Sequence, residues 1–139
     1  MRNCYINGIG SVSIQSVDFD LFTSDVIELT NQNKAQQPSY KELIAPAMIR
    51  RMAKGVKMGI YAANEALKQN NTTELDAIIV GTGLGCIEDS EKFLDAIIAN
   101  DEQFLTPTSF IQSTHNTVAA QIALHLQCKA YNFTYVSGG

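Results

Sequence analysis

The last quarter of the chain, residues 104–139, places the tightest limit on its fold. A proline-containing loop at residues 104–115 leads into an alanine-rich helix, expected from about 116 to 127. Residues 131–136 follow as an apolar strand, and residues 137–139 form a turn of small residues. A helix that feeds a strand ending at such a turn is typical of α/β sheets, in which loops at the strand ends present functional groups.

Strands and helices also alternate through the rest of the sequence. The pattern predicts a strand at 4–14, a loop with one short helix at 15–48, a helix from Pro46 to about Gln69, a strand at 77–80, a glycine-rich turn at 81–85 and a helix at 88–100. The strand at 77–80 is wholly apolar, as expected where a sheet is covered on both faces. The fold class is therefore α/β, with a mixed or parallel sheet covered by helices.

Length and composition indicate one globular domain. The chain has 139 residues, 45% of them hydrophobic, which is enough for one core and too short for two domains. A net charge of −4 argues against nucleic acid as the main partner. We expect no membrane span and no signal peptide, because the apolar runs are only a few residues long. Three cysteines without metal-ligand spacing predict neither a disulfide framework nor a metal site, and favour the cytoplasm.

The glycine-rich turn at 81–85 admits two interpretations. A strand that ends in glycines before a helix could direct backbone N–H groups at a phosphate. The third glycine of the dinucleotide fingerprint is however replaced by Cys86, and no Walker lysine is present. Tight helix–strand packing is therefore favoured over phosphate binding.

Two side chains are candidates for catalytic groups. His115 lies in a Ser-Thr-His-Asn stretch whose hydroxyl and amide groups suit helix capping, and we favour that role over catalysis. Cys86 is expected near a helix N-terminus, which would lower the pKa of its thiol, although a small core residue is the simpler interpretation.

Basic residues gather in the helix expected after Pro46. Arg50, Lys54 and Lys57 share one helical face, and Arg51 lies beside them. An ordinary solvated face is the simpler interpretation. A docking patch for an acidic partner is the functional one.

Several segments, taken in order, resemble the N-terminal half of a β-ketoacyl synthase of the thiolase-like superfamily. The similarity is greatest to ketosynthase-like and chain-length-factor proteins of bacterial aryl-polyene and related pigment clusters. The matching segments are Tyr5-Ile6-Asn7-Gly8-Ile9-Gly10, Arg50-Arg51-Met52, Ile79 to Gly85, and Thr106-Pro107 through Asn116 with the Ala119-Ala120 helix. The resemblance implies half of an αβαβα fold, with residues 1–139 forming a ketosynthase N-terminal-like domain that lacks the C-terminal half.

The catalytic pattern of that family is incomplete in this chain. The resemblance places the nucleophile of the family, a cysteine, at Val136, Ser137 or Gly138, and none of these is a cysteine. Ser137 is a weak substitute, because a hydroxyl ionises far less readily than a thiol. The two histidines of the family belong to the absent half. Whether the chain is an enzyme is therefore left open, and no cofactor is expected.

The resemblance implies a non-condensing subunit, of the chain-length-factor type, in fatty acid or polyketide-type acyl elongation. Its expected partners are an acyl carrier protein, docking at Arg50, Lys54 and Lys57, and a ketosynthase-type subunit in a homo- or heterodimer. Phe110, Gln112, His115 and Asn116 would lie near the subunit interface and the acyl tunnel. The alternatives are an active acyltransferase that uses Ser137 and a small nucleotide-binding or interaction module.

Overall fold

The structure, a computed structural model, describes residues 3–16, 20, 22–70, 72 and 74–137. Its elements are α1 (Pro46–Ile49), α2 (Lys54–Lys68), β1 (Ala77–Thr82), α3 (Ile87–Ala99), α4 (Pro107–Ser113), α5 (Thr117–His125) and β2 (Tyr131–Val136). Within the described ranges, β1 and β2 form one parallel sheet, in which Ala77 pairs with Tyr131 and Thr82 with Val136. The α/β fold class is confirmed.

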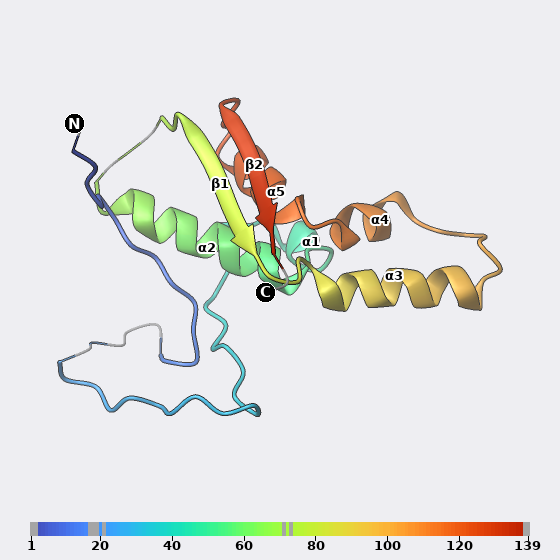
Figure 1. Cartoon of the computed structure of the whole chain (residues 1–139), viewed down its shortest axis with the longest axis horizontal. Helices are drawn as coiled ribbons and strands as arrows, with labels where there is room; N and C mark the ends of the chain where they lie inside the picture. Colours follow the sequence, from blue (N-terminus) through green and yellow to red (C-terminus); the bar gives the residue numbers. More distant parts are fainter. Residues whose placement is uncertain (1–2, 17–19, 21, 71, 73, 138–139) are drawn as a thin grey trace.

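The core lies where α5 packs against α2 and against the sheet (Figure 1). Ile60 of α2 and Ile122 of α5 are both buried, and Ile78 of β1 closes the core from the sheet. The helices approach closely at Gly59, where a Cβ atom would lie 2.9 Å from a methyl group of Val118. This packing brings the turn after β1, the junction between α4 and α5, and the carboxyl end of β2 close together.

The other face of the sheet is open. Tyr131, Phe133 and Tyr135 alternate along β2, and Phe133 lies 6.1 Å from Tyr131 and 4.7 Å from Tyr135 between ring centroids. Ile79 pairs with Phe133 across the ladder and is 61% exposed, whereas its neighbour Ile78 is 8% exposed. The apolar run of β1 therefore has a covered face and an uncovered face, where the sequence led us to expect both to be covered.

The helix expected from Pro46 to Gln69 is divided in two. Pro46 does begin α1, as predicted, but Ala53 has an extended backbone (ψ 149°) and becomes the residue that precedes α2. The backbone N–H of Ala53 donates to Oε1 of Gln112, which is buried (2.9 Å). This hydrogen bond from a distant part of the chain stabilises the break.

The strand expected at 4–14 is also wrong for the residues that the structure describes. Residues 3–14 form no strand, and the segment around Gly8 to Gly10 lies against α2 (Figure 1). The side-chain amide of Gln69 accepts from the N–H of Ile9 and donates to its carbonyl, as a neighbouring strand would. Gly8 and Gly10 allow the close approach, because a Cβ atom at either would collide with backbone carbonyls of α2.

Helices α3 and α4 form a hairpin that extends away from the sheet (Figure 1). The rings of Phe93 and Phe110 meet edge to face with centroids 5.8 Å apart. The Ser90 hydroxyl also donates to the carbonyl of Ser113 (2.7 Å). Helix α4 was not expected from the sequence, although Thr106 caps it and Pro107 occupies its first turn, which is a recognised start signal.

Candidate functional site

A cleft of about 680 Å³ lies at the carboxyl ends of the two strands. Three segments meet there: the turn after β1, the junction between α4 and α5, and the end of β2. The lining residues are Leu84, Cys86, Ser90, Ser113, Thr114, His115, Asn116, Asn132, Phe133, Thr134 and Val136. In parallel α/β sheets, ligands bind preferentially at this end of the strands, so this cleft is the candidate functional site.

Four of the residues singled out from the sequence line this cleft: Cys86, His115, Asn116 and Val136. Cys86 follows β1, His115 and Asn116 lie in the junction between α4 and α5, and Val136 ends β2. Asn116 directly precedes α5, but its side chain makes no capping hydrogen bond. The Asn116 amide therefore does not cap α5, although capping was the role favoured for the Ser-Thr-His-Asn stretch. The side chain of Asn116 is exposed at the cleft.

The position of His115 depends on the glycine turn. Gly85 has a left-handed backbone (φ +63°), and a Cβ atom at this position would lie 3.0 Å from Cβ of His115 and 3.2 Å from its Cα. The N–H of Gly85 donates to Oγ1 of Thr82 (2.9 Å). The turn therefore serves close packing, as favoured from the sequence, and one of the N–H groups that a phosphate would need is already bonded.

Cys86 does not have the activated thiol that its place near a helix N-terminus suggested. It directly precedes α3, and its carbonyl accepts from the N–H groups of Asp89 (3.0 Å) and Ser90 (2.9 Å). Burial raises the pKa of the Cys86 thiol, and the nearby Asp89 carboxylate raises it further. The expected lowering was wrong, because desolvation of the thiolate outweighs the helix dipole. The simpler interpretation, a small core residue, is the better one.

The turn after β2 presents no activated nucleophile among the residues that the structure describes. Ser137 is exposed, and its N–H donates to the carbonyl of Thr82 (3.1 Å), which extends the ladder between the strands. No hydrogen bond joins the Ser137 hydroxyl to a base in the described part of the chain, and no group of metal-binding side chains occurs there. Gly138, the third position considered for the nucleophile, lies outside the described residues.

Phe110 and Gln112, expected near an interface and tunnel, lie on α4 and do not line the cleft. Phe110 packs on Phe93 but is still 57% exposed, so part of its ring is available to a partner. Gln112 is buried against the start of α2.

The three basic residues considered for carrier docking differ in their surroundings. Lys54 lies 3.3 Å from both carboxylate oxygens of Glu88, at the start of α3. The Nζ atom of Lys57 lies 5.8 Å from the ring centroid of Tyr40, in cation–π geometry. Arg50 is exposed and forms no ion pair with the residues that the structure describes.

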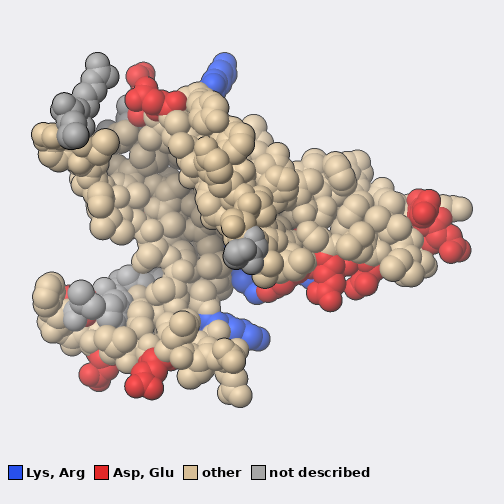
Figure 2. All heavy atoms as spheres, in the orientation of Figure 1, with Lys and Arg blue, Asp and Glu red and all other residues tan. Residues whose placement is uncertain are grey.

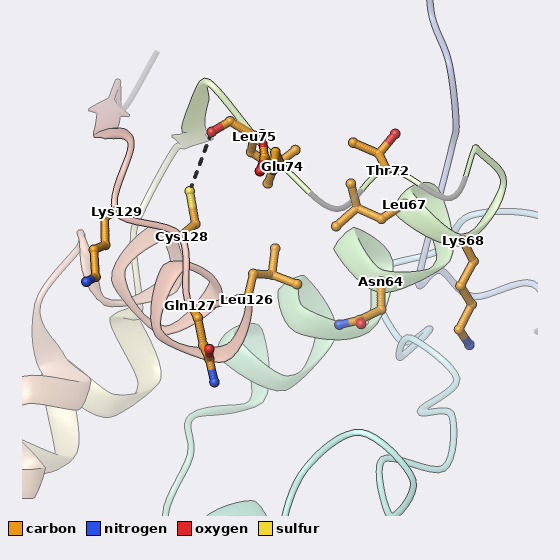
Figure 3. Close-up of a pocket in the computed structure, with 10 residues that line it drawn as sticks. All are labelled: Asn64, Leu67, Lys68, Thr72, Glu74, Leu75, Leu126, Gln127, Cys128 and Lys129. Carbon is orange, nitrogen blue, oxygen red and sulfur yellow. Dashed lines mark hydrogen bonds between the residues drawn. The ribbon is translucent and has the colours of Figure 1, made fainter.

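A second cavity of about 650 Å³ lies at the opposite end of the sheet, between the carboxyl ends of α2 and α5 (Figure 3). Its apolar wall consists of Leu67, Leu75 and Leu126, while Lys68 and Lys129 point away from it. None of the residues selected from the sequence lines this cavity. This cavity is an ordinary hollow of the surface, so the cleft near His115 is the better candidate for a functional site.

Comparison with known proteins shows the fold. No protein-family model matches the chain, and no curated protein matches it in sequence. A solved structure described as the ishigamide ketosynthase/chain length factor superposes with a TM-score of 0.70 at 17% identity, covering 94% of this chain and 39% of that one. The chain thus spans about two fifths of that protein's length and has the fold of part of a ketosynthase/chain length factor. None of the described helices is both long and apolar enough to cross a membrane.

Proposed function

We propose that the chain is, or is part of, a ketosynthase-like subunit of the chain-length-factor type in polyketide-type acyl elongation. On this proposal, residues 1–139 are a ketosynthase N-terminal-like domain that does not itself condense. One observation carries the proposal: the cleft at the strand ends lies in a fold similar to that of a ketosynthase/chain length factor, and no cysteine stands at Val136, Ser137 or Gly138, where the resemblance implies the nucleophile. Three unpaired cysteines are compatible with the cytoplasm as its compartment.

The first test is whether the chain takes up an acyl group. The purified protein is incubated with acyl-carrier thioesters, and its intact mass is measured. No added acyl mass is expected, because Ser137 has no bonded base among the described residues. An acyl adduct that disappears in Ser137→Ala would instead establish the active acyltransferase and overturn the non-condensing assignment.

The second test concerns Phe110, proposed to face the acyl tunnel. With a ketosynthase-type partner present, Phe110→Ala should lengthen the acyl product, because it enlarges the space next to Phe93. Phe104→Ala is the matched control, since Phe104 is 89% exposed in the loop that joins α3 to α4. An unchanged product profile in Phe110→Ala would contradict the tunnel assignment.

The third test concerns an acyl carrier protein, the acidic partner proposed to dock at Arg50, Lys54 and Lys57. The double variant Arg50→Glu with Lys54→Glu should weaken carrier binding through lost charge complementarity. Lys129→Glu, at the far end of the sheet, provides the charge-reversal control. Unchanged affinity in the double variant would reject the patch.

A further inference from the structure

A small cavity of about 150 Å³ lies between α3, α4 and the segment that joins α1 to α2. It shares no lining residue with the cleft at the strand ends. Since a water molecule in the liquid occupies about 30 Å³, the cavity has room for one small ion and a few water molecules. The ring of Phe93 is the apolar part of the lining. The other lining residues are polar: Arg51, Asp89, Lys92, Thr108, Ser109 and Gln112.

Gln112 presents an unused hydrogen-bond donor to this cavity. The residue is only 9% exposed, and its Oε1 atom accepts the N–H of Ala53 (2.9 Å), which fixes the other end of the amide as the nitrogen. The Nε2 atom donates to no acceptor among the described residues. It is not sealed in the interior either, since the sealed side-chain atoms without a partner in the described chain are the hydroxyls of Thr117 and Thr134. A donor of this kind requires an acceptor that the chain does not supply.

Two cationic side chains line the same cavity. Arg51, in the segment between α1 and α2, is exposed and forms no ion pair with described residues. Lys92 of α3 lies 3.8 Å from Oδ1 of Asp89, and its side chain is 72% exposed, so this ion pair is weak. The lining therefore sets two cations and a free amide donor against one carboxylate. Such an excess of donors suits an oxyanion.

The surroundings of the cavity are acidic, which makes its cations unusual. Residues 87–113 contain six carboxylates, and Lys92 is their only basic residue. Figure 2 shows acidic side chains along α3 and at the far end of the hairpin. This field repels anions from the hairpin as a whole, so an anion in the cavity is held by the local donors alone. We expect modest affinity, with a dissociation constant on the order of 1 mM.

We infer that this cavity binds a small tetrahedral oxyanion of the phosphate or sulfate type. Arg51 and Lys92 supply the opposite charge, and the free amide N–H of Gln112 donates to an oxygen of the ion. The three donors belong to three separate elements, and a tetrahedral oxyanion has an oxygen for each, whereas a carboxylate has two. The bound ion stabilises the folded chain by binding linkage. The inference does not depend on the acyl-elongation proposal.

Isothermal titration calorimetry with inorganic phosphate tests the site on the intact chain. Chloride keeps the ionic strength constant, so that general screening does not change during the titration. We expect saturable binding of phosphate and of sulfate, with a rise in melting temperature that follows the binding curve. Acetate, with one charge and two oxygens, should bind more weakly than either. A parent chain that shows no saturable binding of phosphate or sulfate would overturn the inference.

Charge changes in the lining should act in opposite directions. Arg51→Gln and Lys92→Gln should each raise the dissociation constant for phosphate by at least about tenfold, because each removes a charge-assisted contact. Asp89→Asn should lower it, because the variant removes a carboxylate that repels the ion. Lys129→Gln makes the same change of charge at the far end of the sheet and should leave it within about twofold. If Lys129→Gln weakened binding as much as Lys92→Gln, net charge would explain the effect and the site would be refuted.

Gln112→Glu is the sharpest single change. It keeps an acceptor oxygen for the N–H of Ala53 but replaces the free amide donor by a carboxylate oxygen. Phosphate binding should be lost, while circular dichroism in chloride alone shows that the variant is folded. A folded Gln112→Glu variant that binds phosphate as the parent does would contradict the role of this donor.

Two further measurements identify the source of the ion and separate this site from carrier docking. Phenyl phosphate should bind more tightly than inorganic phosphate if the ligand is the phosphate group of a larger molecule, and more weakly if it is the free ion. The carrier-docking variant Arg50→Glu with Lys54→Glu should keep phosphate binding, because neither residue lines the cavity. Loss of phosphate binding in that variant would show that the two sites are one and overturn the inference.

Discussion

Replacing Gly85 by alanine tests the geometry that links the glycine turn to the candidate site. Gly85 has a φ of +63°, and the added Cβ would lie 3.0 Å from Cβ of His115. The left-handed backbone costs an alanine about 1–2 kcal/mol. Crowding against a backbone-attached atom that cannot rotate away adds about 1–3 kcal/mol. The more restricted unfolded chain returns about 0.4–1 kcal/mol.

The free energy of unfolding of Gly85→Ala should therefore fall by about 2–3 kcal/mol. Urea unfolding followed by circular dichroism measures it, and the midpoint should drop by about 1–1.5 M for an ordinary denaturant dependence. The added methyl group should also displace His115 and change the shape of the cleft.

Gly81→Ala and Gly55→Ala are matched controls. An added Cβ atom would meet nothing within 4 Å at either position. Gly81 lies in β1 and Gly55 in α2, where alanine should be neutral or stabilise the fold by up to about 1 kcal/mol. If Gly85→Ala were as stable as these two variants, the tight packing of the turn on His115 would be refuted.

Three further predictions concern single contacts. Gln112→Ala should lower the free energy of unfolding by about 1–3 kcal/mol, because it leaves the buried N–H of Ala53 without an acceptor. Gln112→Glu keeps an acceptor oxygen at this position and should lose less thermal stability. Equal losses in the two variants would contradict this role of Gln112. Cys86 should react with iodoacetamide more slowly than the other two cysteines at mildly alkaline pH, and alkylation at an equal rate would contradict the burial argument. Because the pKa of its thiol is raised in the folded state, its contribution to the free energy of unfolding is present below the ordinary thiol pKa. That contribution is lost as the pH rises through the thiol pKa of the folded protein. Lys54→Ala should change the free energy of unfolding in urea by less than about 0.5 kcal/mol, because both side chains of its ion pair with Glu88 are exposed. A larger loss would show that this ion pair holds α2 and α3 together more strongly than inferred.

Local patterns in the sequence predicted several elements correctly. The helix at 88–100 appears as α3 (Ile87–Ala99), and the strands at 77–80 and 131–136 appear as β1 and β2. These segments have a clear apolar pattern and clear end signals, which depend only on neighbouring residues. The same holds for Pro46, which begins α1 as expected.

Contacts between distant residues decided where the expectations differed from the structure. The helix after Pro46 is interrupted because a side chain from α4 accepts the N–H of Ala53, and a periodic apolar pattern contains no sign of that. Residues 4–14 look like a strand in sequence, but Gln69 at the end of the distant helix takes the place of a neighbouring strand. The environment of Cys86 likewise depends on burial, which sequence position alone does not report.

The sequence by itself determined the α/β class, the glycine turn, the absence of cysteine at Val136 to Gly139, and the acidic and basic segments. Only the tertiary structure decided that His115, Asn116 and Val136 share one cleft, that Lys54 is paired with Glu88, and that one side of α3 remains uncovered. The reason is physical. Backbone preference and apolar periodicity act over a few residues, whereas burial, ion pairing and the meeting of loops depend on how α5 packs between α2 and the sheet.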